Sequence, residues 1–333
     1  ILITGSAGFI GFHLSKLLLS EGFSICGYDG LTTYYDINLK KNRNSVLLKN
    51  SKYIFSQGML EEYENLDLLF DRYQPEIVIH LAAQAGVRYS LENPRSYLNS
   101  NVVGTFNVME MAKKYKVKHL LIASTSSIYG SNTDMPFNEN SKTDTQLTIY
   151  AATKKANESM AHAYAHLWNI PTTIFRFFTV YGPWGRPDMA LFKFVSSILK
   201  EKPIDIYNNG EMFRDFTYVD DLVMSIKLLM ENLPTRSKSK IINSTDSISP
   251  VAPYRIVNIG NSKKIKLLDF IEAIEDNLNK KAIRNYMPIQ KGDVKETWAD
   301  SSLLMDLTGY RPNTDFKKGI SQFIKWYREY YNI

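Results

Sequence analysis

Thr4-Gly5-Ser6-Ala7-Gly8-Phe9-Ile10-Gly11 is the stretch of sequence that decides the fold. It follows a short apolar run that we expect to be a strand, and it opens a helical pattern. In this context Gly5 permits a tight turn, Gly8 lets backbone amides approach a pyrophosphate, and Gly11 allows the helix to pack closely on the strand. The motif therefore predicts a dinucleotide-binding unit at the start of the chain.

Strand-like runs alternate with helical patterns through the first half of the chain. This alternation predicts an α/β fold, a Rossmann doubly wound parallel sheet with a smaller C-terminal α/β lobe. We expect residues 1–180 to bind the nucleotide and residues 181–333 mainly the substrate, partly interleaved with the first part. The expected elements are strands at Ile1–Thr4, Phe23–Asp29, Tyr53–Gln57, Ile77–Ala83, His119–Ser124 and Thr173–Phe178, helices to about Glu21 and at 94–114, 150–168, 189–201, 219–232, 266–280 and 316–331, and a Ser-rich loop at Thr235–Pro253.

Composition excludes several classes of protein. No apolar run approaches the roughly 20 residues of a membrane helix, and the single cysteine, Cys26, suits a reducing, cytoplasmic compartment. The net charge of +6 includes two short basic stretches, Lys40–Arg43 and Lys263–Lys266, which match no nucleic-acid module. We interpret the charge as scattered surface charge plus a pocket for anionic substrates. His162 and His166 lack a third ligand nearby, so we expect no metal. From the charge pattern and the short apolar runs we also expect neither nucleic acid nor a membrane as a partner.

Asp29 ends the second expected strand. A carboxylate at this point can accept both hydroxyls of an adenosine ribose, and it would repel the additional phosphate of NADP. The sequence therefore predicts NAD as the cofactor.

Tyr150 and Lys154 are four residues apart and share one face of an expected helix. A free tyrosine has a pKa near 10, but a nearby ammonium and a positive nicotinamide ring favour the phenolate. Tyr150 can then take a proton from a substrate hydroxyl while the adjoining carbon gives hydride to the cofactor. Hydroxyls of Ser124–Ser127 can bridge substrate and tyrosine. The pattern predicts an oxidoreductase-type site.

Five longer motifs narrow this prediction: Ala82–Ser90, Tyr150–Glu158, the very specific Arg176–Ala190, Arg214–Asp221 and Gly292–Val294. With them the chain resembles the extended short-chain dehydrogenase/reductase family of nucleotide-sugar enzymes over nearly its whole length, and most closely its UDP-glucuronate 4-epimerases. The resemblance implies C4 epimerisation of a UDP-uronic acid, UDP-glucuronate to UDP-galacturonate, through a transient 4-keto sugar. It also implies a homodimer built on the helices at 94–114 and 150–168.

The resemblance assigns roles to individual residues. Tyr150, Lys154 and Thr125 would be catalytic, Arg214 would pair with the diphosphate, and Asp293 would hold the uridine ribose. Arg88 would be the main specificity residue of a carboxylate clamp. The implied cofactor-binding residues are Gly5, Gly8, Phe9, Ile10, Gly11, Asp29, Leu81, Ala82, Ala83, Asn101, Tyr150 and Lys154, and the implied substrate-binding residues are Arg88, Ser126, Ser127, Thr179, Arg186, Arg214 and Asp293.

Related activities remain as alternatives. A 4-keto uronate is a β-keto acid that loses carbon dioxide readily, and decarboxylating or dehydrating relatives carry acidic residues where this chain has Ser126 and Ser127. Their absence disfavours a UDP-glucuronate decarboxylase. Arg88 disfavours a UDP-glucose or UDP-N-acetylglucosamine 4-epimerase. Because Tyr150 and Lys154 are both present, a non-catalytic NAD-sensing scaffold is disfavoured as well.

Two residues depart from the family pattern on the adenosine side. Relatives usually have Asp after the glycine that ends the third strand, where it contacts adenine, but here Met59 follows Gly58. Relatives often have Asn after the ribose acid, where this chain has Gly30. We expect these changes to affect the affinity for NAD and to leave the chemistry unchanged.

Overall fold

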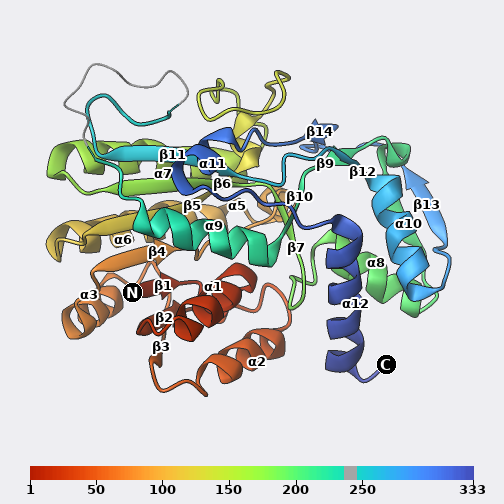
Figure 1. Ribbon diagram of the computed structural model, residues 1–333, viewed down its shortest axis with the longest axis horizontal. Coiled ribbons are helices and arrows are strands. Elements are labelled where there is room, and N and C mark those ends of the chain that lie inside the picture. The colour runs from red at the N-terminus through yellow and green to blue at the C-terminus, as the bar shows by residue number, and fades with distance from the viewer. Residues whose placement is uncertain (236–245) are drawn as a thin grey trace.

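A parallel seven-stranded sheet forms the centre of the molecule (Figure 1). The computed structural model describes residues 1–235 and 246–333. The strand order is β11-β6-β5-β4-β1-β2-β3, and the order reverses between β1 and β4, which creates a crevice at the carboxyl ends of the strands. The strands are β1 (Leu2–Thr4), β2 (Ile25–Asp29), β3 (Tyr53–Gln57), β4 (Ile77–His80), β5 (His119–Thr125), β6 (Thr172–Phe177) and β11 (Tyr254–Ile259). The six expected strands are confirmed, and β11 is an additional one.

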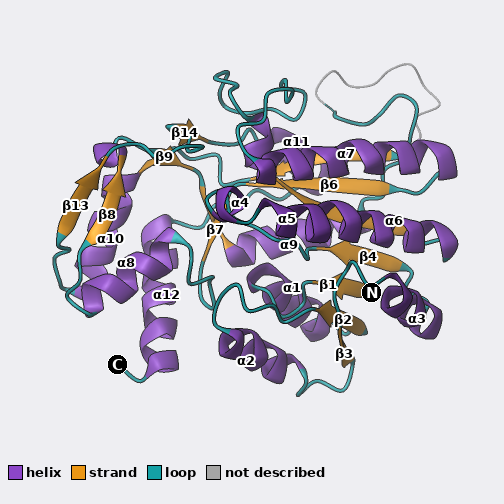
Figure 2. Ribbon diagram, turned by 180° about the vertical axis from the view of Figure 1, so that it is seen from behind, coloured by secondary structure: helices purple, strands orange, loops and turns teal. Residues whose placement is uncertain are grey.

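Helices cover both faces of this sheet. On the face turned to the viewer in Figure 1 lie α1 (Phe9–Ser20), α9 (Val219–Glu231) and α11 (Ser302–Thr308), with α2 (Ile37–Leu47) beside α1. The opposite face, seen in Figure 2, carries α3 (Tyr63–Tyr73), α6 (Gly104–Lys114) and α7 (Ile149–Trp168). The helix expected at 94–114 is interrupted: short α4 (Tyr89–Glu92) and α5 (Pro94–Tyr97) precede a π-helical segment, Leu98–Val103, and then α6.

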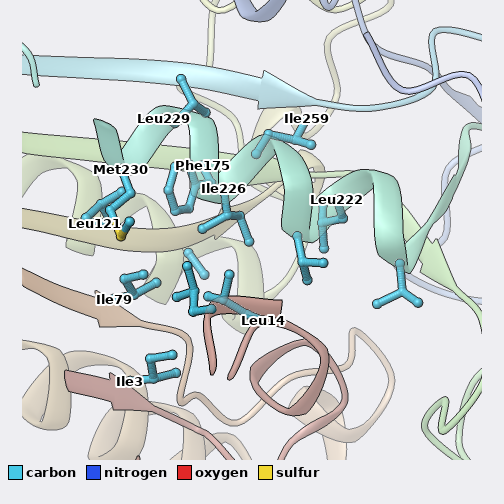
Figure 3. Packing of buried hydrophobic residues seen from close by; sticks show 14 of the residues in the cluster. Ile3, Leu14, Ile79, Leu121, Phe175, Leu222, Ile226, Leu229, Met230 and Ile259 are labelled. Carbon is cyan, nitrogen blue, oxygen red and sulfur yellow. The ribbon is translucent and has the colours of Figure 1, made fainter. Parts of the chain in front are cut away.

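The core between sheet and helices follows from the apolar spacing of the sequence. In α9, Leu222, Ile226 and Leu229 recur at helical spacing and point toward the sheet (Figure 3). They meet apolar strand residues such as Phe175, which is fully buried. Burying each such side chain is worth about 1.5–3 kcal/mol, so this packing holds α9 firmly on the sheet.

A second, smaller lobe is built from the rest of the C-terminal half. Its apolar core lies between α8 (Ala190–Leu199), α10 (Leu267–Leu278) and α12 (Phe316–Tyr331). Three small sheets complete it: β8 (Ile204–Tyr207) with β13 (Arg284–Met287), β9 (Phe213–Arg214) between β12 (Ile265–Lys266) and β14 (Glu296–Thr297), and β7 (Thr179–Tyr181) with β10 (Phe216–Tyr218).

The two lobes are interleaved along the chain. Both α9 and β11 come from the second half, yet they pack into the first lobe, so residue 180 does not separate the lobes. The reason is that β11 pairs with β6 along its whole length, from Tyr254 opposite Thr172 to Ile259 opposite Phe177. The assignment of the two parts to nucleotide and substrate stays a prediction.

The structure bears on three further expectations, which concern the Ser-rich loop, a basic stretch and membrane-spanning helices. Within Thr235–Pro253, residues 236–245 lie outside the described part of the chain, and the described remainder is tied to α7 by the 2.8 Å hydrogen bond between His162 and Ser249. The interpretation of Lys40–Arg43 as surface charge was wrong for two members, because the side chains of Lys40 and Arg43 are buried. In the described ranges no helix is long and apolar enough to cross a membrane.

Candidate active site

A cavity of about 720 Å³ opens at the carboxyl ends of the strands and is lined by residues of both lobes. Most of the expected site residues line it together. They are Gly5, Gly8, Phe9, Ile10, Gly11, Asp29, Leu81, Ala82, Ala83, Thr125, Ser126, Ser127, Tyr150, Lys154, Thr179, Arg186, Arg214 and Asp293. The other two, Arg88 and Asn101, do not line it.

The glycine loop leaves room for a ligand at the start of α1. Gly5 has a positive φ of +73°, and a Cβ on it would lie 2.8 Å from the nitrogen of Ala82. A Cβ on Gly11 would lie 2.1 Å from the oxygen of Gly5, so the helix can approach the strand only without a side chain there. No side chain caps the N-terminus of α1, so its free N–H groups are available to a pyrophosphate.

Asp29 is fixed beside this loop at the end of β2. Its Oδ1 accepts a hydrogen bond from the Leu31 nitrogen over 2.8 Å, and its Oδ2 accepts one from the Ala7 nitrogen over 3.1 Å. Burial raises the pKa of Asp29, while the hydrogen bond from Leu31 and the positive charge of Lys40 act in the opposite direction. The carboxylate is thus oriented at the cavity wall, where a pair of ribose hydroxyls can reach it.

The structure brings Tyr150, Lys154 and Thr125 together. Thr148 caps α7 by accepting a hydrogen bond from the Ala151 nitrogen, which starts the helix just before Tyr150. Burial raises the pKa of Tyr150, whereas Thr125 and the positive charge of Arg186 lower it. The ammonium of Lys154 is also buried, and burial lowers its pKa to about 8. Tyr150 therefore needs a nearby cation if it is to work as a base at neutral pH.

A buried ion pair positions the catalytic helix on the sheet. The guanidinium of Arg176 in β6 contacts both carboxylate oxygens of Glu158 in α7, at 3.1 and 2.9 Å. Glu158 also accepts a 2.7 Å hydrogen bond from Ser124 at the end of β5. Arg176 and Glu158 belong to quoted motifs but had no predicted role, and the hydroxyl of Ser124, expected to bridge substrate and tyrosine, donates to Glu158 instead. Their place in the structure is to fix α7 against β5 and β6.

Asn101 supports the cavity wall from behind. Its Oδ1 accepts a hydrogen bond from the Gln84 nitrogen over 2.8 Å, and its Nδ2 donates one to Thr153 over 3.1 Å. Gln84 lines the cavity, whereas the side chain of Asn101 is fully buried. Its position therefore suits the placement of Gln84 and α7 better than direct contact with a nucleotide.

The two arginines expected in the carboxylate clamp occupy different places. Arg186 lines the cavity close enough to Tyr150 to lower its pKa, and it pairs with Asp188. Arg88 is 45% exposed and pairs with Asp293 over 3.2 Å, with its guanidinium over the ring of Tyr207. The geometry therefore places Arg186 beside the reacting centre and Arg88 near the expected uridine site.

Arg214 is held in an extended position by backbone oxygens. It donates to Phe213 and Lys295 through Nη1, at 2.8 and 3.0 Å, and to Val294 through Nη2 at 2.7 Å. The neighbouring Asp215 is buried and accepts hydrogen bonds from three backbone N–H groups. Burial raises the pKa of Asp215 to about 6. The contacts of Arg214 with Val294 and Lys295 tie β9 to the segment that leads into β14 and hold Arg214 near Asp293.

Arg43 is a residue that the sequence analysis missed. Its Nη1 donates to the oxygen of Ala7 in the glycine loop over 3.0 Å, and its Nη2 donates to the oxygen of Trp184. It thus links the glycine loop to the segment that carries Arg186. The available signal was its spacing, because Arg43 lies midway between the buried Leu39 and Leu47 on one face of α2.

The site and fold match known proteins along nearly the whole chain. Residues 1–244 match the NAD dependent epimerase/dehydratase family. The chain is 50% identical over 332 residues to a probable UDP-glucuronate 4-epimerase of Rhizobium meliloti (strain 1021), covering 99% of this chain and 97% of that protein. It is 42% identical over 336 residues to UDP-glucuronate 4-epimerase 1 of Arabidopsis thaliana, covering 99% and 77% respectively. The crystal structure of UDP-glucuronic acid 4-epimerase from Bacillus cereus with UDP-glucuronic acid and NAD is similar with a TM-score of 0.88, at 30% identity and 99% coverage of both chains.

Proposed function

The chain belongs to the NAD dependent epimerase/dehydratase family, and we infer that it is an NAD-dependent UDP-glucuronate 4-epimerase. It interconverts UDP-glucuronate and UDP-galacturonate through a transient 4-keto sugar. The observation that carries this conclusion is the composition of one cavity. It joins a dinucleotide loop, the Tyr150/Lys154 pair and an arginine beside that pair.

The residues of the first lobe fit NAD. The free N-terminus of α1 suits the pyrophosphate, and Asp29 suits the adenosine ribose. When bound, NAD supplies the acceptor that takes a hydride from C4 of the sugar and later returns it. Tyr150 accepts the proton of the C4 hydroxyl at its phenolic oxygen and gives it back to the new hydroxyl. Lys154 and Thr125 would stabilise the phenolate of Tyr150 before the proton is taken and after it has been returned.

We assign the carboxylate of the sugar to the wall formed by Arg186, Ser126, Ser127 and Thr179. Nη1 of Arg186, which makes no hydrogen bond to the described residues, can donate to the carboxylate, and hydroxyls can complete the contact. Holding the carboxylate in a fixed direction opposes its loss as carbon dioxide from the 4-keto sugar. In the second lobe, Arg214 would hold the diphosphate and Asp293 the uridine ribose.

We further propose a homodimer formed through α6 and α7 and the π-helical segment. Large apolar side chains are exposed there, among them Leu98 (50% exposed), Phe106 (43%) and Trp168 (46%). Their burial against a second copy would remove an apolar surface from water. Phe106→Glu should give a monomer by light scattering. Leu68→Glu is the matched control, because Leu68 is an apolar residue of α3, 69% exposed, outside the proposed interface. A wild-type protein that is monomeric at micromolar concentration would contradict the dimer.

We place the enzyme in the cytoplasm, where its product would serve polysaccharide synthesis. The chain has a single cysteine, Cys26, which cannot form a disulfide within the chain, and this suits a reducing compartment. A fluorescent fusion in the source cell would test the location. Export of the fusion would contradict it.

Incubation with UDP-glucuronate and NAD, followed by proton NMR, tests the activity itself. We expect a mixture of UDP-glucuronate and UDP-galacturonate without release of carbon dioxide. Formation of UDP-xylose or of a 4-keto pentose would show a decarboxylase. No conversion of UDP-glucuronate, together with conversion of UDP-glucose, would show an epimerase of neutral sugars.

A further inference from the structure

Tyr34 links the two lobes at the wall of the cavity. It lies in the loop between β2 and α2, and its hydroxyl donates a hydrogen bond to Oδ2 of Asp188 over 3.2 Å. Asp188 comes from the other lobe, in the segment between β7 and α8 that also carries Arg186. Tyr34 and Arg186 both line the cavity. The arginine assigned to the sugar carboxylate is therefore tied, through Asp188, to a side chain of the first lobe.

The hydrogen bond from Tyr34 adds a third contact to the carboxylate of Asp188. Oδ1 of Asp188 accepts from Nε of Arg186 over 3.0 Å, and Oδ2 accepts from Nη2. These two contacts fix the arginine and the aspartate relative to each other, but they leave the pair free to move as a unit. Two hydrogen bonds join the pair to the first lobe: the one from Tyr34, and one from Nη2 to the backbone oxygen of Ala85 over 3.4 Å. Tyr34 makes the shorter of the two.

Tyr34 is itself held in place. Its ring packs against that of Tyr89, with the ring centroids 4.7 Å apart. Gly86 leaves room for the contact, because a Cβ there would lie 3.1 Å from the Tyr34 hydroxyl and 3.8 Å from Nη2 of Arg186. Burial raises the pKa of Tyr34 to about 12, so the hydroxyl stays protonated and remains a donor at neutral pH.

The direction of the sugar carboxylate decides between two fates of the 4-keto sugar. Carbon dioxide leaves when the bond between C5 and C6 stands across the plane of the C4 carbonyl, because its electron pair can then form a double bond between C4 and C5. The resulting enolate takes a proton from solvent at C5 and becomes a UDP-linked 4-keto pentose. The hydride taken from C4 stays on the nicotinamide. Carbon dioxide, 4-keto pentose and NADH are therefore formed in equal amounts.

We propose that Tyr34 is a positioning residue, which acts through Asp188 to hold Arg186 and the sugar carboxylate in a direction that prevents this loss of carbon dioxide. The proposal rests on the proposed function, because it needs the 4-keto uronate as an intermediate. Tyr34 need not touch the substrate for this role. It fixes an ion pair that would otherwise be joined to the first lobe only by the long contact with Ala85.

The ratio of 4-keto pentose to UDP-galacturonate tests the proposal, because this ratio does not depend on how much of the protein is folded. Tyr34→Phe removes the hydroxyl and keeps the ring, whose centroid lies 5.9 Å from the guanidinium carbon of Arg186. The full-length variant is incubated with UDP-glucuronate and NAD, both sugars are measured by proton NMR, and NADH is measured by its absorbance. We expect the ratio to rise at least about tenfold over the wild-type protein, the scale of a lost hydrogen bond to a charged group.

Tyr35→Phe is the matched control. It removes a hydroxyl from the same loop, but that hydroxyl accepts a hydrogen bond from Arg43 and has no contact with Asp188. The control should therefore keep the wild-type ratio. Asp188→Ala should raise the ratio at least as much as Tyr34→Phe. Because Tyr34 acts through Asp188, the double variant should then have the same ratio as Asp188→Ala alone.

Several outcomes would overturn the proposal. They are an unchanged ratio in Tyr34→Phe, an equal rise in Tyr35→Phe, and additive effects of Tyr34→Phe and Asp188→Ala. Loss of both products in Tyr34→Phe would also overturn it, since the hydroxyl would then be needed for turnover itself. A wild-type protein that makes no UDP-galacturonate would instead overturn the proposed function, and the role of Tyr34 with it.

Discussion

Arg186 and Asp188 form an ion pair at the cavity wall, with Arg186 Nε 3.0 Å from Asp188 Oδ1. Asp188 also accepts a hydrogen bond from the hydroxyl of Tyr34 over 3.2 Å. The guanidinium uses Nε and Nη2 in its contacts, while Nη1 makes no hydrogen bond to the described residues. Asp188 therefore holds Arg186 in a fixed direction and leaves one nitrogen for an anionic ligand.

Arg186→Ala should weaken the binding of UDP-glucuronate at least tenfold more than that of UDP-glucose, because only the uronate has a carboxylate to lose its partner. Arg88→Ala is the comparison. Arg88 lies outside the cavity lining and pairs with Asp293, so we expect it to weaken both nucleotide sugars alike. Calorimetric titration of both ligands into both variants measures this. A selective loss of UDP-glucuronate in Arg88→Ala alone would return the clamp to Arg88.

Tyr150→Phe should lower kcat by about 10²–10⁴-fold, the usual contribution of a positioned acid–base group. The ring remains, so the fold should be kept and the affinity for UDP-glucuronate should change less than threefold. Turnover is followed by proton NMR and binding by calorimetry. A variant that loses its affinity for the nucleotide sugar to the same extent as its activity would show that Tyr150 has a binding role.

The pH dependence of turnover should report the buried ammonium of Lys154. Burial lowers its pKa to about 8, so Lys154 is a cation below that pH and becomes neutral above it. Because the cation favours the phenolate of Tyr150, kcat should fall as the pH rises through about 8. Residual activity of Lys154→Arg should lack this fall, since a guanidinium stays charged. A wild-type kcat that rises steadily up to pH 9.5 would contradict the role of the ammonium.

Glu139 should make the protein more stable in mild acid. Burial raises the pKa of this carboxyl to about 7, from an ordinary value of 4.5. The folded state therefore binds this proton more tightly than the unfolded state, and stability is lost as the pH rises from about 4.5 through about 7. Glu139→Gln keeps an acceptor for the Asn258 nitrogen and removes the titration.

Denaturant unfolding of both proteins at pH 5 and pH 8 measures this effect. Between these two values the variant should gain about 1–3 kcal/mol of unfolding free energy relative to the wild-type protein. Parallel pH curves for the two proteins would contradict the assignment of the effect to Glu139.

Sequence patterns predicted the first lobe well because its signals are local. The strand β3 (Tyr53–Gln57) and the helix α7 were predicted almost to the residue from apolar spacing. The strand β11 was not predicted, since it follows a Ser-rich stretch and lies far in sequence from its partner β6. The expected helix at 219–232 also lies far in sequence from the first lobe, so it was assigned to the second lobe, although α9 packs on the first.

The site shows the same division between local and long-range information. The motifs and the resemblance to nucleotide-sugar enzymes predicted most of the residues that line the cavity. They could not distinguish Arg186 from Arg88, because that difference depends on how the two lobes meet. Partners such as Asp188 and the buried Arg43 became visible only in three dimensions. The effect of Met59 and Gly30 on the affinity for NAD stays a prediction.

The fate of deuterium placed at C4 of UDP-glucuronate tests the central claim most directly. The mechanism removes hydrogen from C4 as a hydride and returns it to the same carbon within one cavity, so it never exchanges with water. We therefore predict that UDP-galacturonate formed by the enzyme retains the deuterium at C4, as followed by NMR. Release of the label into water at the rate of product formation would contradict this mechanism, because it would mean that the hydrogen leaves C4 as a proton.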